Sequence, residues 1–298
     1  HRKGYSYQDL SPGNFFIDKK NGDVLICDND NVAPDGSNLG VGGTPGYMAP
    51  EVILGKEKPS TNTDLFSLSV ILFELLFLAH PLEGANCCKY PCLTPQIEEE
   101  LYAEHPVFVC STTDRSNGPV RGICSNLMSL WPIYPDYIHD AFQTAFSEEA
   151  LHDGRKRKTE MFWRDILYRL LDDAVVCPCC GEINFASKSN GKEIICTECH
   201  KKQILPYSIV SEHARLVAQN GKMLTQFHVT HGSRDATIGT VVESKKTKGV
   251  YGLKNESSFI WAVEYPEKPT VSYEPGKTVT LIPQTKITIG NKTIHVEE

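Results

Sequence analysis

The chain has 298 residues, of which 40% are hydrophobic and 22% charged, a composition that supports packed domains and excludes a largely disordered protein. The formal net charge of -7 argues against a protein that wraps nucleic acid through a basic face. The longest apolar run, residues 67–79, contains Glu74 and is shorter than the roughly 20 residues of a membrane span. We therefore expect a cytoplasmic protein without a signal peptide that binds neither nucleic acid nor membranes.

From the N-terminus to about residue 60, short apolar runs alternate with Gly, Pro, Asn and Asp, which is typical of short strands and structured loops. A helix is predicted over residues 63–77, with one of residues 61–63 as its N-cap. Residues 85–130 lack periodicity and are predicted to be irregular. Apolar residues spaced three and four apart predict helices within residues 134–173.

Five of the eleven cysteines fall within residues 177–199, and this uneven distribution argues against a disulfide framework. A short helix is predicted around residues 211–219. The tail then turns to β structure, because strand-length runs are separated by Gly, Pro, Asn and Lys. The predicted strands include QFHVTH (226–231), VYGL (250–253), IWAVEY (260–265), TVTLI (278–282) and KITIG (286–290).

Residues 7–14 read YQDLSPGN, and residues 26–31 read ICDNDN. Phosphoryl transfer needs one carboxylate that orients a hydroxyl and accepts its proton, and a second carboxylate and an amide oxygen that hold magnesium. The first motif resembles the protein-kinase catalytic loop H-R-D-L-K-P-x-N, and D-N-D stands where kinases have D-F-G. The resemblance implies that Asp9 is the catalytic base, that Asn14 and Asp28 bind magnesium, and that ATP is the phosphate donor.

Three further pieces follow in the order expected for a kinase. GTPGYMAPE (residues 43–51) resembles the end of an activation segment, with Thr44 facing the protein substrate and Glu51 closing the A-P-E motif. Asp64 stands where kinases use an aspartate to hold the catalytic-loop backbone. Arg157, in GRKRK, matches the late arginine that pairs with the A-P-E glutamate, which explains this basic run better than nucleic-acid binding does.

The match is closest to the bacterial kinase-like proteins encoded near the tellurite-resistance-associated von Willebrand A proteins and metal-dependent phosphatases. The segments that carry this resemblance are DLSPGNFFID, ICDNDNVAPDG, GTPGYMAPEV, TDLFSLSVILFELL, HPLEG and HPVFV. It implies a kinase lobe followed by a zinc ribbon, and a von Willebrand A-type protein and a metal-dependent phosphatase as partners.

Departures from the kinase pattern leave other interpretations open. Ser11 replaces the catalytic-loop Lys and Gln8 replaces the Arg that commonly contacts a phosphorylated loop, so a pseudokinase or scaffold is the alternative. A binding module centred on the C-terminal domains is a third. Only about six residues precede Tyr7, so we expect a kinase C-terminal lobe without the nucleotide-binding N-terminal lobe. We expect this chain to be inactive by itself. We also expect the apolar stripe Phe66, Val70 and Phe73 to need cover from an upstream helix or another chain.

The cysteine window contains two C-x-x-C pairs, a spacing that provides four thiolates for a tetrahedral structural zinc. Reduced core cysteines are the alternative. Cys179 is expected to be a spare thiol, and His200 a bystander or a substitute ligand. The predicted ligands are Cys177, Cys180, Cys196 and Cys199.

The C-terminal strands resemble the second half of a forkhead-associated β-sandwich, a fold that reads phosphothreonine. Ser233 and Arg234 are the candidate phosphate contacts, against a sandwich used for protein contacts. The predicted fold class is therefore α+β and multidomain. It comprises a mainly helical kinase C-terminal lobe (1–174), a zinc ribbon (175–206) and a small all-β, sandwich-like domain (222–298).

Overall fold

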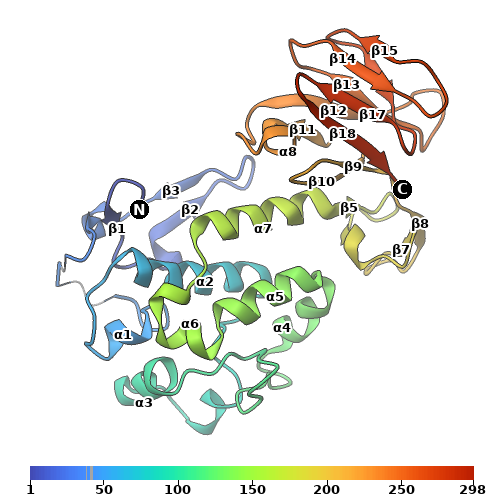
Figure 1. Ribbon diagram of the computed structural model, residues 1–298. Coiled ribbons are helices and arrows are strands. Elements are labelled where there is room, and N and C mark those ends of the chain that lie inside the picture. Colours follow the sequence, from blue (N-terminus) through green and yellow to red (C-terminus); the bar gives the residue numbers. More distant parts are fainter. Residues whose placement is uncertain (38, 41–42) are drawn as a thin grey trace. The chain divides into compact units, whose positions relative to one another are not determined.

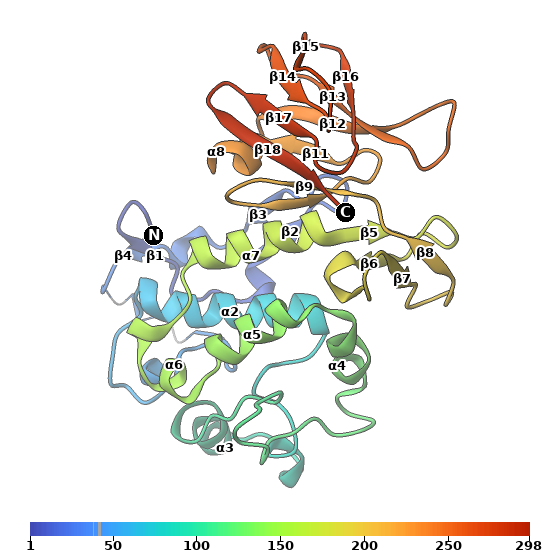
Figure 2. The same cartoon turned by 45° about the vertical axis from the view of Figure 1, so that its right-hand side comes forward.

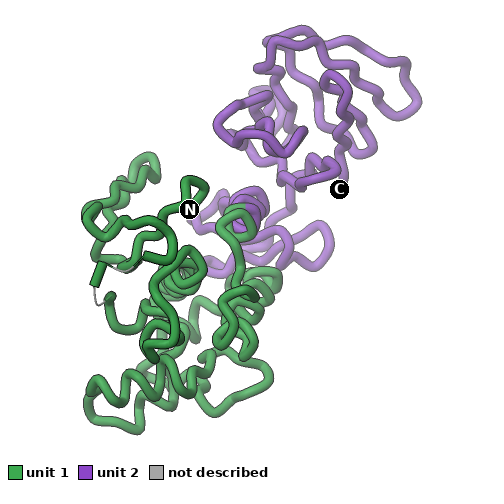
Figure 3. The backbone as a smooth tube through the Cα atoms, turned by 60° about the vertical axis from the view of Figure 1, so that its left-hand side comes forward, with its two compact units in different colours: residues 1–164 green, residues 165–298 purple. Residues whose placement is uncertain are grey.

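The computed structural model describes residues 1–37, 39–40 and 43–298. The chain has mixed α/β structure in two compact units, His1–Arg164 and Asp165–Glu298 (Figure 3). The three domain bounds predicted from the sequence are finer than this division and stay a prediction.

The first unit combines two short two-stranded sheets, β1–β4 and β2–β3, with helices (Figure 1). Its strands are β1 (Tyr5–Ser6), β2 (Phe15–Ile17), β3 (Val24–Ile26) and β4 (Ala33–Pro34). Its α-helices are α1 (Pro50–Ile53), α2 (Thr61–Phe77), α3 (Pro95–Glu99), α4 (Ser125–Leu130), α5 (Asp136–Ala145) and α6 (Glu148–His152), and α7 (Glu160–Asp173) begins here and ends in the second unit. Single turns of 3-10 or π helix lie at Pro12–Asn14, Asn29–Asn31, Cys87–Lys89, Glu100–Glu104, Trp131–Ile133 and Gly154–Lys156. The stretch predicted to be irregular, 85–130, thus holds short helical segments separated by loops. Across the described ranges 1–37, 39–40 and 43–298, no helix is both long and apolar enough to cross a bilayer.

Helix α2 begins earlier than the sequence predicts, because its N-cap is Ser60. The Ser60 hydroxyl accepts the Thr63 backbone N–H at 3.4 Å, and the Thr63 hydroxyl accepts the Ser60 N–H at 2.8 Å. This reciprocal pair satisfies two donors at the helix start. The helix ends at Leu78, which is left-handed with φ of 52°.

The apolar stripe on α2 is buried by the first unit itself. Phe66, Val70 and Phe73 are 2%, 0% and 0% exposed. The Phe73 ring meets those of Phe142 on α5 and Phe108 at centroid distances of 5.1 and 5.5 Å, and α2 lies beside α5 in both views (Figures 1 and 2). The expectation that an upstream helix or another chain must cover this stripe is therefore wrong.

The second unit contains two small hairpins followed by a β-sandwich. The hairpins, β5 (Ala174–Val176) with β6 (Ile183–Phe185) and β7 (Glu193–Ile195) with β8 (Lys202–Ile204), form what we call the cysteine ribbon. The sandwich has a six-stranded sheet of order β10-β9-β18-β17-β14-β15 and a four-stranded sheet of order β11-β12-β13-β16. These strands are β9 (Ser208–Val210), β10 (Arg215–Val217), β11 (Met223–Thr225), β12 (Thr237–Glu243), β13 (Tyr251–Asn255), β14 (Trp261–Glu264), β15 (Val271–Tyr273), β16 (Thr278–Thr280), β17 (Lys286–Ile289) and β18 (Lys292–Glu297).

Both sheets contribute to one buried core. Trp261 and Ile287 come from the larger sheet and Val241 and Leu253 from the smaller one, and each is 0% exposed. Four of the five strand runs quoted above lie in this sandwich, which confirms the β prediction for them.

Two secondary-structure predictions in this unit are wrong. QFHVTH forms helix α8 (Gln226–Thr230), because Thr225 and His228 make a capping box and His231 ends the helix in the left-handed region. The predicted helix at 211–219 is instead strand β10, which pairs antiparallel with β9. At β10 this pairing outweighs the local periodicity.

Candidate active site and metal centre

The β2–β3 hairpin brings the two predicted magnesium ligands to one place. Phe15 pairs with Ile26, so Asn14 immediately precedes the hairpin and Asp28 closely follows it. The Cys27 backbone N–H donates to the Asn14 carbonyl at 3.0 Å, which extends the ladder beyond the strands. Asn14 therefore lies opposite Cys27, the residue before Asp28, at the open end of the hairpin.

Asp9 has both carboxylate oxygens engaged by neutral donors. The Asn14 amide nitrogen donates to Oδ2 at 3.0 Å and to the Asp9 carbonyl at 2.8 Å. The Thr44 hydroxyl donates to Oδ1 at 2.7 Å. The catalytic-loop candidate, a magnesium-ligand candidate and the substrate-loop threonine thus form one hydrogen-bonded group with a fixed carboxylate orientation.

Asp28 is held by two residues that the sequence analysis does not single out for this role. The Tyr7 hydroxyl donates to the Asp28 carbonyl oxygen at 2.7 Å. The Asn31 amide nitrogen donates to Asp28 Oδ2 at 2.9 Å. A polar side chain three residues after Asp28 on the same 3-10 turn is a weak sequence signal, and the Tyr7 contact has none.

Asp64 supports the catalytic loop from the first turn of α2. Its side chain is 3% exposed, and Oδ2 accepts the Tyr7 backbone N–H at 2.7 Å and a His1 ring nitrogen at 2.9 Å. The hydrogen bond to Asp64 raises the pKa of His1 although partial burial opposes it, and the nearby Glu160 adds to the rise. Ser11, in the place of the kinase lysine, is buried at 4% exposure.

The loop that carries Thr44 is tied to α2 and to the segment after it. The Ser67 hydroxyl donates to the Tyr47 carbonyl at 2.7 Å, and the Tyr47 hydroxyl donates to Glu74 at 2.6 Å. Burial, and then the bond to Glu74, raises the pKa of Tyr47. His80 Nε2 lies 2.9 Å from the carbonyl oxygen of Gly46, whose φ is +83°.

Glu51 and Arg157 form a buried bidentate ion pair. Nη1 and Nη2 of Arg157 donate to the two carboxylate oxygens at 2.6 and 2.7 Å, and the side chains are 2% and 14% exposed. Arg157 also donates to the carbonyls of Ala150 and Asn62 at 3.2 and 3.1 Å. The pair connects the end of the substrate loop to the segment before α7.

The four predicted cysteine ligands converge in the cysteine ribbon. The sulfur atoms of Cys177, Cys180, Cys196 and Cys199 all lie within 4.8 Å of one another. Cys177 Sγ is 3.7 Å from Cys199 Sγ, and Cys180 Sγ is 3.6 Å from Cys196 Sγ. Burial acts to raise the pKa of Cys196, but backbone N–H donors of Cys199 and Glu198 and the Asn184 amide lower it to about 6.

Both halves of the ribbon use the same turn. The Gly181 N–H donates to the Cys177 carbonyl at 2.9 Å, and the His200 N–H donates to the Cys196 carbonyl at 3.1 Å. Gly181 and His200 have φ of 81° and 57°. His200 therefore occupies the place of the first turn's glycine and is not among the four converging ligands. Cys179 is exposed and outside the cluster, as the sequence analysis expects of a spare thiol.

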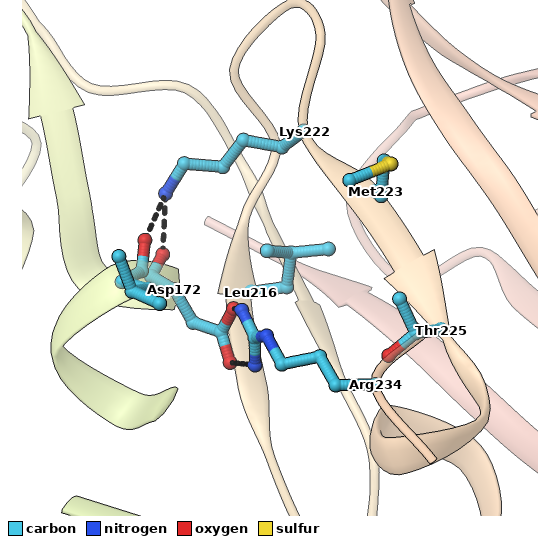
Figure 4. A pocket seen from close by; sticks show the side chains of 7 residues that line it. Asp172, Leu216, Lys222, Met223, Thr225 and Arg234 are labelled. Atoms are coloured by element: carbon cyan, nitrogen blue, oxygen red, sulfur yellow. Dashed lines mark hydrogen bonds and ion pairs between the residues drawn. The ribbon is translucent and has the colours of Figure 1, made fainter. Parts of the chain in front are cut away.

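Arg234, a candidate phosphate contact, is paired inside the second unit. Its Nη1 donates to Asp172 Oδ2 at 3.0 Å, its Nη2 contacts Oδ1, and its guanidinium lies 4.7 Å from the Tyr168 ring centroid. Lys222 Nζ donates to the Asp172 carbonyl at 2.6 Å beside a small pocket (Figure 4). Because Asp172 neutralises the Arg234 guanidinium, Arg234 is not available to bind a phosphate, which corrects that expectation. The Ser233 hydroxyl donates to Asp235 Oδ2 at 3.2 Å.

The pKa of Asp172 is lowered by this cluster. Burial at the end of α7 favours the neutral acid, but the nearby His228 ring and the hydrogen-bonded Arg234 guanidinium outweigh it. His228 Nδ1 accepts the Thr225 N–H at 2.9 Å, which leaves Nε2, 3.2 Å from Asp172 Oδ2, as the ring's proton-bearing nitrogen. Within the second unit, the cluster ties Asp172, near the end of α7, to His228 and Arg234.

Comparison with known families gives a match at the N-terminal part of the chain. Residues 1–104 match the model of the protein kinase domain. This segment includes Asp9, Asn14 and Asp28, and it ends before Arg157 and the four clustered cysteines. The first 104 residues are therefore kinase-like.

Curated relatives that match this chain are protein kinases. CBL-interacting protein kinase 30 of Oryza sativa subsp. japonica is 39% identical over 92 residues, which cover 29% of this chain and 19% of the relative. CBL-interacting serine/threonine-protein kinase 5 of Arabidopsis thaliana is 35% identical over 92 residues, with 29% and 20% covered. The chain thus spans about a fifth of the length of these relatives.

A solved structure is also similar to part of the chain. It is the kinase PK-1 of Cydia pomonella granulovirus, with 19% sequence identity and a TM-score of 0.34, covering 53% of this chain and 47% of that one.

Proposed function

We propose that this chain is part of a serine/threonine protein kinase that transfers the γ-phosphoryl group of ATP to a hydroxyl of a protein substrate. The observation that supports this most directly is the hydrogen-bonded group of Asp9, Asn14 and Thr44 at the hairpin end that also carries Asp28. Phosphoryl transfer depends mainly on positioning and charge neutralisation, and these are the residue types that provide both.

In this proposal Asp9 is the catalytic base. Its carboxylate would orient the substrate hydroxyl and take its proton as the oxygen attacks the γ-phosphorus. Asn14 and Thr44 hold the two carboxylate oxygens, so the side chain does not have to reorganise during transfer. Asp64 holds the backbone of Tyr7, two residues before Asp9, and the Tyr7 hydroxyl holds the backbone of Asp28.

Magnesium, when bound, would neutralise the phosphate charge, and the candidate ligands fit an oxygen-seeking cation. The Asp9 carbonyl oxygen can only accept a hydrogen bond, so the Asn14 side-chain atom that faces it must be the amide nitrogen. The Asn14 amide oxygen then remains for a cation. The Asn31 amide nitrogen donates to Asp28 Oδ2, so Asp28 Oδ1 remains for a cation.

The test is phosphate transfer by the full-length protein from radiolabelled ATP to an array of peptides that each carry one Ser or Thr. Asp9→Asn and Asp28→Asn should each lower transfer by at least a hundredfold, because the base or the metal ligand is lost. Asp30→Asn is the matched control, since Asp30 is exposed on the same 3-10 turn as Asp28. Equal transfer by all four proteins would contradict the assigned roles.

The second candidate function is a pseudokinase or scaffold, and Ser11 is the residue that favours it. A serine cannot supply the positive charge that a lysine places near the transferred phosphate. ATP binding without transfer to any peptide of the array would support this alternative over the enzyme.

We further propose that the four clustered cysteines bind one structural zinc ion. A tetrahedral site with Zn–S bonds of about 2.3 Å has sulfur atoms roughly 3.8 Å apart, close to the Sγ–Sγ distances of 3.6 and 3.7 Å found in the cluster. A cytoplasmic location stays part of the proposal, on the gathering of the cysteines as metal ligands. A von Willebrand A-type protein and a metal-dependent phosphatase stay proposed partners on the sequence resemblance.

A further inference from the structure

Gln8 lies between Tyr7 and the catalytic candidate Asp9 in a backbone conformation that few residues adopt. Its φ is 65°, and the Asp9 N–H donates to the Tyr7 carbonyl at 2.9 Å, as in a tight three-residue turn. Turns with a positive φ at a non-glycine centre are strained and recur at functional sites.

The Gln8 amide uses both of its ends on the loop between β4 and α1. Its Nε2 donates to the Ser37 carbonyl at 2.9 Å, and its Oε1 accepts the Leu39 backbone N–H at 3.1 Å. The side chain is buried, with the residue 7% exposed. The neutral Gln8 amide therefore binds the loop backbone at two positions, as a donor at Ser37 and as an acceptor at Leu39.

The same loop reaches the catalytic group at a second point, where Thr44 donates to Asp9 at 2.7 Å. Gln8 is the central residue and Asp9 the last residue of one strained turn, so the loop is bound to two consecutive residues of that turn. We propose that Gln8 is a positioning residue that fixes the substrate-facing loop by neutral hydrogen bonds. The loop would then need no phosphate and no ion pair to be held at this point.

This inference rests on the proposed kinase function for its catalytic consequence, but the contact can be tested without activity. Amide hydrogen exchange of Leu39 is measured in wild type and in Gln8→Met, which keeps the length of the side chain and loses both hydrogen bonds. One hydrogen bond of ordinary net strength predicts exchange roughly two- to tenfold faster in Gln8→Met. An unchanged rate at Leu39 would overturn the proposal.

Gln8→Glu gives a sharper test, because the carboxyl group matches the amide in shape only when protonated. At pH 7.5 an ionised carboxylate cannot donate to the Ser37 carbonyl, so exchange at Leu39 should be faster than in wild type. At pH 5, burial favours the protonated acid, which can both donate and accept, and the ratio to wild type should return toward one. A ratio that is the same at both pH values would contradict the clamp, even if the variants lose some stability.

Transfer to the best peptide of the array separates this inference from the proposed function. If wild type transfers phosphate, phosphatase pretreatment should leave its rate unchanged, and Gln8→Met should raise the KM for the peptide more than it lowers kcat. A tenfold loss after phosphatase treatment would overturn the neutral clamp. If wild type shows no transfer, the kinase proposal fails while the exchange ratios still decide the role of Gln8.

Discussion

Removal of the Arg157 guanidinium should destabilise the first unit strongly. In Arg157→Met the Glu51 carboxylate loses both of its arginine donors at 14% exposure, and the Ala150 and Asn62 carbonyls lose theirs. Breaking one side of a buried ion pair costs about 3–5 kcal/mol. For a unit of this size, each kcal/mol lowers the melting temperature by roughly 2–4 °C, so the expected loss is about 6–20 °C.

The assay is thermal unfolding followed by tryptophan fluorescence. Trp131 and Trp163 both lie in the first unit, and Trp163 is 2% exposed, so their emission should report its unfolding. Arg155→Met is the matched control, because Arg155 pairs with Asp153 at the surface with a side chain that is 84% exposed. The control should melt as wild type does, since exposed ion pairs contribute little.

A loss of less than about 1 kcal/mol in Arg157→Met, the value expected of a surface pair, would show that the buried pair does not stabilise the first unit as expected. The double variant Glu51→Gln with Arg157→Met adds a second check. It should recover part of the loss, because the unpaired charge that remains in the single variant is then gone.

Three further outcomes follow from the structure. Metal analysis should find one zinc per chain, which is lost in Cys196→Ser and kept in Cys179→Ser. Loss of zinc in both variants would contradict the assignment of Cys179 as a spare thiol. Because the pKa of Asp172 is held below its ordinary 3.8, its stabilising effect is present above that pH and is lost as the pH falls through the folded-state pKa, so Asp172→Asn should flatten the acid limb of a stability–pH curve. Gly46→Ala should cost roughly 1–2 kcal/mol in urea unfolding, because φ is +83° and a new Cβ would lie 3.3 Å from His80 Nε2; an unchanged midpoint would contradict this.

The parts of the site that could be predicted are those encoded within a few residues of one another. Asp9 and Asn14 stand in one loop motif, and the paired C-x-x-C spacing brings four sulfurs together with little help from the rest of the fold. In each case the geometry follows from a single turn or hairpin. Local sequence is enough to specify such structures.

The residues that escaped prediction act through contacts between distant segments. Tyr7 reaches Asp28, and Gln8 reaches Ser37 and Leu39, with no local pattern that signals either contact. The sequence predicted a phosphate contact for Arg234, but Asp172, 62 positions earlier, forms an ion pair with it. The stripe on α2 looked uncovered for the same reason, since its cover comes from side chains such as Phe142.

The two ends of the cysteine ribbon are tied to neighbouring residues of the sandwich. The Gln219 side chain exchanges two hydrogen bonds of 2.8 Å with the backbone of Val176, where the ribbon begins. The Ala218 N–H donates to the Tyr207 carbonyl at 2.7 Å, where the ribbon has ended. Because Ala218 and Gln219 are consecutive residues, the start and the end of the ribbon are held near each other. Such a segment can be lengthened, exchanged or replaced by a short linker during evolution without moving the strands that flank it.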